Sequence, residues 1–188
     1  MLRNPLAHLI TVISLPRNCI EDIGIIVTNC LNVEWLNVEG NLISELPPPG
    51  AMAQCKKLKL VNLHHNGIHR VESLISLASL PRLVGLTLYN CPIYKRAGYR
   101  HHTVNTIWSL KALDHYVLSD EEIIEGADFK NTRFESMASS LKINLNPNEK
   151  TEQALKEVLE RINMIGKHNS PVIIIQRLVR VFIVVVSK

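Results

Sequence analysis

Histidine is the residue type in this chain whose spacing comes closest to a chemical site. His64, His65 and His69 lie close together, and His101 and His102 follow further along. Imidazole nitrogens bind zinc, but adjacent side chains on a strand point to opposite faces, so His64 and His65 cannot both hold one ion. No cysteine or carboxylate is placed to complete a ligand set, and no C-x-x-C pair occurs. We therefore expect neither a metal nor another cofactor.

Catalytic signatures are also missing from the sequence. A nucleophilic enzyme needs a Ser, Cys or Thr beside a positioned base, and a phosphate-binding loop needs clustered glycines. The chain has eight glycines in 188 residues, no G-x-S-x-G and no P-loop. We expect no catalytic residue and predict a noncatalytic protein.

Composition and charge narrow the range of partners. The chain has 46% apolar and 20% charged residues, as soluble domains do. Residues 167–188 hold four of the 21 basic residues and none of the 17 acidic ones, so the rest is net neutral. Because residues 1–166 carry no net charge, a nucleic-acid partner, which requires clustered Lys and Arg, is disfavoured.

We also expect no membrane span, since no uncharged apolar stretch reaches ~18 residues, and no export signal. A reducing, cytoplasmic location follows, and we allow for cytoskeletal association.

A repeated aliphatic pattern organises the first half of the chain. The motif V-x-x-L-x-V-x-x-N-x-I at 33–43 recurs at 58–68 and 83–93, and an earlier copy occupies 10–20. Alternation within each motif fits a short strand, and the residues between copies have helical apolar spacing. The pattern matches the leucine-rich repeat. It predicts an α/β solenoid of parallel strands with convex helices, followed by a C-terminal cap and a helical tail.

Polar residues recur at the turn where each motif leaves its strand. These predicted structural turn positions are Asn18, Asn41, Asn66 and Cys91. Their side chains should satisfy backbone groups between coils, because a buried unsatisfied polar group costs ~1–3 kcal/mol. Cys30 and Cys55 share another repeat position, which Leu80 fills in the last copy, so we predict core cysteines rather than ligands or disulfides.

The outward-facing strand residues are the predicted recognition surface, since solenoids bind along their concave face. Trp35 and Tyr89 are the expected anchors, because aromatic residues dominate interface energetics; ordinary surface is the alternative. The predicted partner-binding residues are Glu34, Trp35, Asn37, Glu39, Lys59, Asn62, His64, Thr87 and Tyr89. They favour a protein-protein interaction scaffold with a protein partner of unknown identity.

The segments that follow the repeats differ in pattern. We expect four repeats at 1–96, a repeat cap at 97–124, an irregular connection at 125–145, an amphipathic helix at 146–166 and a tail at 170–188. Within the cap, Leu110 and Leu113 should form a final strand, and Ser119 with Glu122 a capping box. The first repeat has too few preceding residues for a polar cover, so we expect either a truncated chain or an exposed first coil.

The helix expected at 146–166 has clear end signals and one apolar face. Asn146 fits an N-cap, Pro147 the first helical position and Gly166 a stop. The apolar face comprises Leu155, Val158, Leu159, Ile162 and Ile165. This spacing predicts a helix that packs against another part of the fold.

The tail contains the first half of an IQ motif. Ile175, Gln176 and Arg180 match it, whereas Val181 and Val185 replace the usual glycine and second basic residue. Such motifs bind calmodulin or a related light chain as basic amphipathic helices. A calmodulin-binding calcium-signalling subunit is therefore the alternative function. Because the tail is rich in β-branched residues, an apolar segment folded against the solenoid is the structural alternative.

Together these features resemble a known family. The repeats, the segments 98–115 and 119–124, and His168-Asn169-Ser170-Pro171 before the Ile-Gln are similar to the leucine-rich repeat and IQ domain-containing proteins. Members of that family are longer at both ends, so the resemblance implies a truncated form. The cap also resembles that of the phosphatase-regulator and U2-small-nuclear-ribonucleoprotein repeat proteins, which suggests a ribonucleoprotein scaffold as a weaker alternative.

Overall fold

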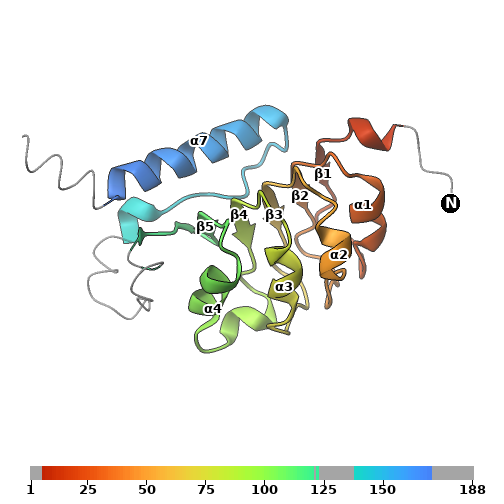
Figure 1. Cartoon of the computed structure of the whole chain (residues 1–188), viewed down its shortest axis with the longest axis horizontal. Coiled ribbons are helices and arrows are strands. Elements are labelled where there is room, and N and C mark those ends of the chain that lie inside the picture. Colours follow the sequence, from red (N-terminus) through yellow and green to blue (C-terminus); the bar gives the residue numbers. More distant parts are fainter. Residues whose placement is uncertain (1–5, 121, 123–137, 171–188) are drawn as a thin grey trace, which may run out of the picture.

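The computed structural model describes residues 6–120, 122 and 138–170. A single sheet runs through this part of the chain, with its strands in chain order (Figure 1). The strands are β1 (Val12–Ser14), β2 (Trp35–Asn37), β3 (Leu60–Asn62), β4 (Gly85–Thr87), β5 (Ala112–Leu113) and β6 (Tyr116–Val117). The first five pair in parallel and β6 pairs antiparallel to β5. The predicted leucine-rich-repeat solenoid is confirmed.

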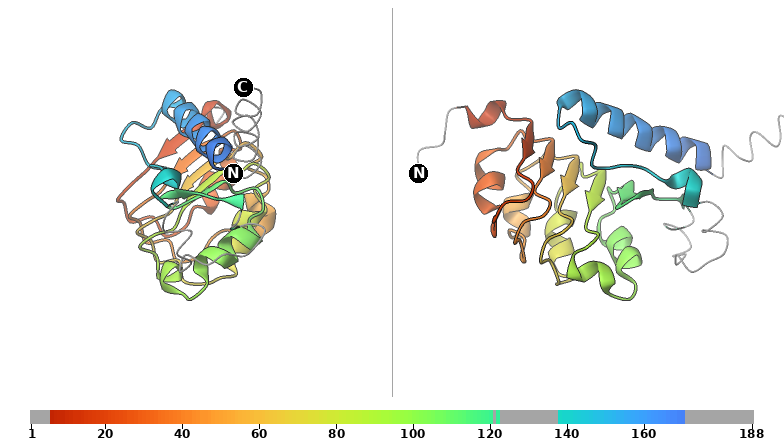
Figure 2. Two further views of the ribbon diagram at one scale, coloured as in Figure 1. Left: turned by 90° about the vertical axis from the view of Figure 1, so that its left-hand side faces the viewer. Right: turned by 180° about the vertical axis from the view of Figure 1, so that it is seen from behind.

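Helices cover both faces of the sheet, in unequal numbers. The convex-side helices are α1 (Gly24–Asn29), α2 (Pro49–Met52), α3 (Ser73–Ala78) and α4 (Tyr99–Thr106), and the short 3-10 helices are η1 (Ala7–Leu9) and η2 (Pro92–Lys95). One long helix, α7 (Glu152–Asn169), lies on the opposite, concave side. The two views in Figure 2 show the stacked coils and α7 lying along them.

The main core lies between the sheet and the convex helices. Leu36, Val61, Leu86 and Leu113 occupy one row across the strands, each in register with the next. All four are at most 1% exposed. The alternation of the repeat motif turns these residues toward α1–α4 and turns their neighbours toward the concave side. A second, separate core therefore forms there.

The cap closes the last coil through buried polar contacts. Ser119 and Glu122 form the predicted capping box: each backbone N–H donates to the other's side chain, at 3.1 Å and 3.3 Å. The Arg100 guanidinium also pairs with the Glu122 carboxylate. Leu110 was expected in the final strand, but it lies in the preceding turn, where its N–H donates to Ile107.

Helix α7 begins later and ends later than the sequence predicts. Thr151, not Asn146, is the N-cap, and its Oγ1 accepts a 3.1 Å hydrogen bond from Ala154 N–H. The expected stop at Gly166 is wrong, since the helix runs to Asn169. A Cβ at Gly166 would lie 4.0 Å from Val117 Cγ1, an ordinary van der Waals distance, so α7 packs close to β6 at this residue and a side chain the size of alanine would fit there.

Candidate functional site on the concave face

The concave side of the sheet carries a row of apolar residues at one register position. Val12, Trp35, Leu60, Gly85 and Ala112 are successive partners across β1–β5. Trp35, Leu60 and Ala112 are 0% exposed. A Cβ at Gly85 would lie 2.7 Å from Leu60 Cδ1, so this glycine provides the space that the Leu60 side chain fills. The row is a packed surface rather than an open ribbon.

A chain of hydrogen bonds runs beside this row. Trp35 Nε1 donates to Asn62 Oδ1 at 2.7 Å, and Asn62 Nδ2 donates to Thr87 Oγ1 at 3.3 Å. Thr87 Oγ1 lies 2.7 Å from His64 Nδ1, and His64 Nε2 lies 2.9 Å from Glu39 Oε2. A neutral His64 with its proton on Nε2 gives every hydrogen bond in the chain one donor and one acceptor: Thr87 Oγ1 donates to Nδ1, and Nε2–H donates to Glu39. The network fixes these five side chains relative to one another.

The segment 138–146 is the first of two layers that cover the concave face. Leu141, Ile143 and Leu145 are buried in the same cluster as Trp35 and Leu60. Their backbone joins the sheet: Ile143 N–H donates to His115 O at 2.8 Å, and Asn62 Nδ2 donates to Leu145 O at 3.0 Å. The pattern L-x-I-x-L at 141–145 has the period of a strand. We predicted an irregular connection here, and this alternation was the signal that could have revealed the contact.

Helix α7 is the second layer. Leu155, Val158, Ile162 and Ile165 are buried, and Leu159 packs partly against the same cluster. Polar contacts join α7 to the strand ends: Thr11 Oγ1 donates to Glu152 Oε1 at 2.5 Å, and Lys111 Nζ donates to Asn163 Oδ1 at 3.3 Å. The apolar face that the sequence predicts therefore packs on the sheet.

Ahead of α7, Lys150 lies over Trp35. Its Nζ is 5.3 Å from the centre of the Trp35 ring, within the range of a cation–π contact. Burial lowers the pKa of Lys150, and the negative charge of Glu39 opposes that shift. The indole of Trp35 is therefore enclosed by residues of its own chain.

These contacts correct the prediction of an exposed concave ribbon. Five of the nine predicted partner-binding residues are buried beneath the covering segments: Trp35, Asn37, Asn62, His64 and Thr87. Glu34, Glu39, Lys59 and Tyr89 are half-buried. Glu34 and Lys59 pair with each other at 2.6 Å. The structure places Trp35 in a core rather than at a surface, because 138–170 supplies its apolar partners.

An aromatic rim remains accessible at the carboxyl ends of the strands. Tyr89 stacks on His64 with ring centres 4.2 Å apart, and His65 and His115 flank it at 5.7 Å and 4.5 Å. His65 and His115 are exposed and Tyr89 is half-buried. We call Tyr89, His65 and His115 the aromatic rim. Sequence reasoning named Tyr89 but missed the two histidines as its neighbours.

His64 differs from these histidines in its electrostatics. Burial lowers the pKa of His64 to about 4, and the negative charge of Glu39 opposes this shift. The imidazole is therefore neutral at physiological pH, in agreement with its bonds to Thr87 and Glu39. Burial also raises the pKa of Tyr89, so its hydroxyl stays protonated.

The turn residues hold successive coils together. Asn41 Oδ1 accepts from Asn18 N–H and Ile20 N–H, at 3.2 Å and 3.1 Å, and Asn41 Nδ2 donates to three carbonyl groups. Asn66 makes the equivalent bonds one coil later. Cys91 Sγ donates to Leu63 O at 3.2 Å. The side chains of Asn41, Asn66 and Cys91 satisfy the hydrogen bonds of backbone groups between coils, so their role is structural. Asn18 is exposed, and its side chain donates to Pro16 O in the same turn; its link to the next coil is the backbone N–H that donates to Asn41.

Cysteines at the other repeat position also lie in or against the core. Cys55 is 2% exposed and Cys30 packs against the same cluster. Cys55 Sγ donates to Val27 O at 3.3 Å, and neither cysteine forms a disulfide. Burial raises the pKa of the Cys55 thiol, which reduces its reactivity.

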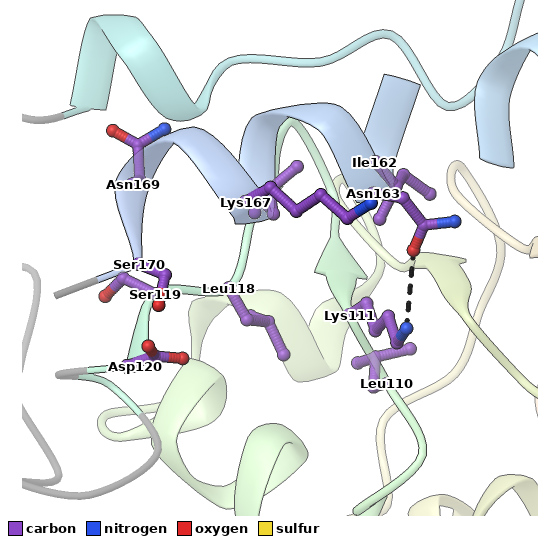
Figure 3. A pocket seen from close by; sticks show the side chains of 12 residues that line it. Leu110, Lys111, Leu118, Ser119, Asp120, Ile162, Asn163, Lys167, Asn169 and Ser170 are labelled. Carbon is purple, nitrogen blue, oxygen red and sulfur yellow. Dashed lines mark hydrogen bonds between the residues drawn. The ribbon is translucent and has the colours of Figure 1, made fainter. Parts of the chain in front are cut away.

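Two hollows flank α7. A cavity of about 330 Å³ lies between its C-terminal end and the cap, near Leu118, Ser119 and Asn163 (Figure 3). A groove of about 770 Å³ lies between α7 and the first strands, lined by Thr11, Glu34 and Leu155 among others.

The part of the chain that the structure describes has neither a cluster of metal ligands nor a helix suited to a membrane. There, no three His, Cys, Asp or Glu side chains are grouped to hold a metal ion. Over the same residues, no helix has the length and apolar character required to cross a bilayer. The IQ-like residues Ile175, Gln176 and Arg180 lie outside the described residues.

Comparison with known proteins agrees with this architecture. No family model matches the chain. It is 42% identical over 163 residues to mouse leucine-rich repeat and IQ domain-containing protein 3, and 39% identical to the human protein. Each match covers 83% of this chain and 26% of the relative. Mouse leucine-rich repeat-containing protein 51 is 31% identical over 101 residues, which is 52% of either protein.

Solved structures show the same fold. A chain from the crystal structure of the Drosophila melanogaster SNF/U2A' complex superposes with a TM-score of 0.58 at 17% sequence identity. The match covers 75% of this chain and 82% of that one. At this identity the likeness concerns the fold alone.

The stacked strands, the asparagine turns and these matches define a leucine-rich-repeat protein. The resemblance to the leucine-rich repeat and IQ domain-containing proteins is confirmed, because 83% of the chain aligns with protein 3 of that name. The chain spans about a quarter of the length of these relatives.

Proposed function

We propose that this chain is a noncatalytic protein-interaction scaffold whose partner contacts the aromatic rim. The observation that carries the proposal is that Tyr89 of the predicted surface stays accessible at the carboxyl ends of the strands, where the exposed His65 and His115 gather around it. Aromatic rings bury large areas at little cost in side-chain entropy and dominate binding hot spots. The rigid β3–β5 framework positions the three rings before a partner arrives.

Quantitative affinity capture with a double variant tests this role. Tyr89→Ala/His115→Ala should weaken capture of the specific partner about 30-fold, as expected from a loss of about 2 kcal/mol. Tyr94→Ala/His69→Ala is the matched control, because both residues are exposed away from the rim. Mass spectrometry of the captured proteins gives the readout. If the rim variant and the control retain the same proteins in the same amounts, the rim is not the binding surface.

The calmodulin hypothesis remains a second candidate because the relatives' names include an IQ domain. Ile175, Gln176 and Arg180 are the residues that would carry it. Titration of the chain with calmodulin, with and without calcium, tests it directly. Ile175→Ala/Gln176→Ala should abolish the binding, whereas no binding to the unsubstituted chain in either condition would remove this candidate.

A further inference from the structure

Four turns form a row along the rim of the sheet opposite the aromatic rim. Each turn leads into the next strand, β2 to β5, and they occupy 31–32, 56–57, 81–82 and 108–109. Backbone bonds just after the turns place the coils side by side: Lys59 N–H donates to Glu34 O at 2.8 Å, and Lys111 N–H to Val84 O at 2.9 Å. The turns are therefore neighbours in space.

The middle turns of this row carry unopposed positive charge. Lys56, Lys57 and Arg82 are exposed, and within the described part of the chain none has a carboxylate within 4.0 Å. None of the four turns contains Asp or Glu. The nearby Glu34 is occupied by Lys59 at 2.6 Å. Three cations thus lie on two adjacent coils although 1–166 is net neutral overall.

An exposed tryptophan lies one coil beyond these cations. Trp108 is 82% exposed, whereas Ile107 and Leu110 beside it are 1% and 4% exposed and anchor the turn in the core. Leu110 N–H closes the turn onto Ile107 O at 3.0 Å. The indole is therefore held in solvent by a rigid turn. Tryptophan is the residue type most enriched at binding hot spots.

We propose that this row, the basic turn row of Lys56, Lys57, Arg82 and Trp108, docks an acidic segment of a partner protein. Carboxylates would contact the three cations, and an apolar residue of the segment would pack on Trp108. The inference rests on the proposed scaffold role but uses a different rim. Neighbouring strands lie about 4.8 Å apart and an extended peptide rises about 3.3 Å per residue. About three residues should therefore separate the apolar residue from the carboxylate at Lys56 and Lys57, two strands away, and about one to two residues should separate it from the carboxylate at Arg82, one strand away.

Nucleic acid fits the row less well. Phosphate tracking needs more cations than three, and single strands use several aromatic residues on which successive bases stack. The row offers one indole. An acidic segment with a single apolar residue requires only what the row contains.

Fluorescence anisotropy with a defined probe tests the proposal. The probe is a labelled synthetic peptide in which glutamates flank one phenylalanine, and the same peptide with glutamine at the glutamate positions is the charge control. The chain should bind the acidic peptide and not the control, and added salt should weaken binding. Lys57→Glu/Arg82→Glu and Trp108→Ala should each weaken it roughly tenfold.

A matched charge reversal separates local recognition from net charge. Lys95→Glu/Arg96→Glu changes the same number of charges at exposed residues in and after η2, outside the row, and should leave affinity within about twofold. Equal loss in both reversals, or unchanged binding in the row variant, would overturn the proposal. Binding of an oligouridylate in place of the acidic peptide would also overturn it. None of these results alters the test of the aromatic rim, which uses other residues.

Discussion

The indole N–H of Trp35 donates a 2.7 Å hydrogen bond to the side-chain oxygen of Asn62 on the next strand, and both residues are 0% exposed. The bond links the apolar packing of the concave core to the chain of hydrogen bonds beside it. The Trp35 ring fills the second core, while Asn62 continues through Thr87 to His64. Apolar packing and the polar chain therefore depend on the same pair.

Removing that bond should destabilise the protein. Trp35→Phe leaves Asn62 Oδ1 without its donor, and we expect a loss of about 1–3 kcal/mol in the free energy of unfolding. Trp108→Phe is the control, since its side chain is 82% exposed and should change stability by less than about 0.5 kcal/mol. Urea unfolding followed by circular dichroism measures both. Equal stabilities would show that the bond contributes nothing.

Glycine positions give a second pair of opposite predictions. A Cβ at Gly85 would approach Leu60 to 2.7 Å, so Gly85→Ala should cost about 1–3 kcal/mol by overpacking. Gly50 lies in α2 with no atom within 4 Å of the added Cβ, so Gly50→Ala should stabilise by about 0.4–1 kcal/mol. Thermal unfolding compares the two variants. A neutral Gly85→Ala would contradict the packing described for the concave core.

The cover of the concave face can be disrupted from the buried side of α7. Ile162→Asp places a charge in the concave core, on the side of α7 that faces Val117, so α7 should lose its docking while Leu36 and the convex core stay packed. Hydrogen exchange should then accelerate in 141–165 and much less in α1–α4. Met164→Asp is the control because its side chain is 54% exposed. Uniform exchange across the chain would instead indicate one cooperative unit.

Acid should destabilise the fold through His64. Its pKa is lowered from 6.5 to about 4, so the folded state resists a proton that the unfolded state accepts. The contribution of neutral His64 to the free energy of unfolding is therefore fully present above pH 6.5. It is lost as the pH drops toward 4, by roughly 1–3 kcal/mol. Burial raises the pKa of Asp114, which acts in the opposite direction. Only the difference between variants isolates His64.

Urea unfolding at neutral pH and at about pH 4.5 measures that difference. His64→Gln should lose much of the pH dependence, because glutamine cannot be protonated in this range. His69→Gln should keep it, since His69 is exposed and contacts only the nearby Gly67 O. Identical pH profiles for the two variants would remove His64 as the cause.

The sequence predicted the solenoid because its determinants are local and periodic. Leu36, Val61 and Leu86 recur at one spacing, and Asn41 and Asn66 recur with them, so strand, register and turn follow from one repeat. The cap was equally readable, since Ser119 and Glu122 form a short-range motif. Such features need no knowledge of distant contacts.

The concave face could not be predicted in the same way. Whether Trp35 is exposed depends on Leu145 and α7, which lie more than 100 residues away in the chain. Alternation predicts which way a strand side chain points but not what lies opposite. The helix start was missed for a related reason. Asn146 has the side chain of an N-cap, but its Nδ2 donates to Glu39, and within the described residues its Oδ1 accepts no hydrogen bond from a helix N–H.

Gly85 lies where Leu60 and Leu145 meet, and this contact has an evolutionary corollary. A larger residue at position 85 would require smaller ones at 60 or 145, because the three share one volume. Among related chains, substitutions at these positions should arise together. Sequence differences at these concave-core positions would then reflect changes in internal packing. Differences that reflect a change of binding partner would be expected at the two rims of the sheet instead.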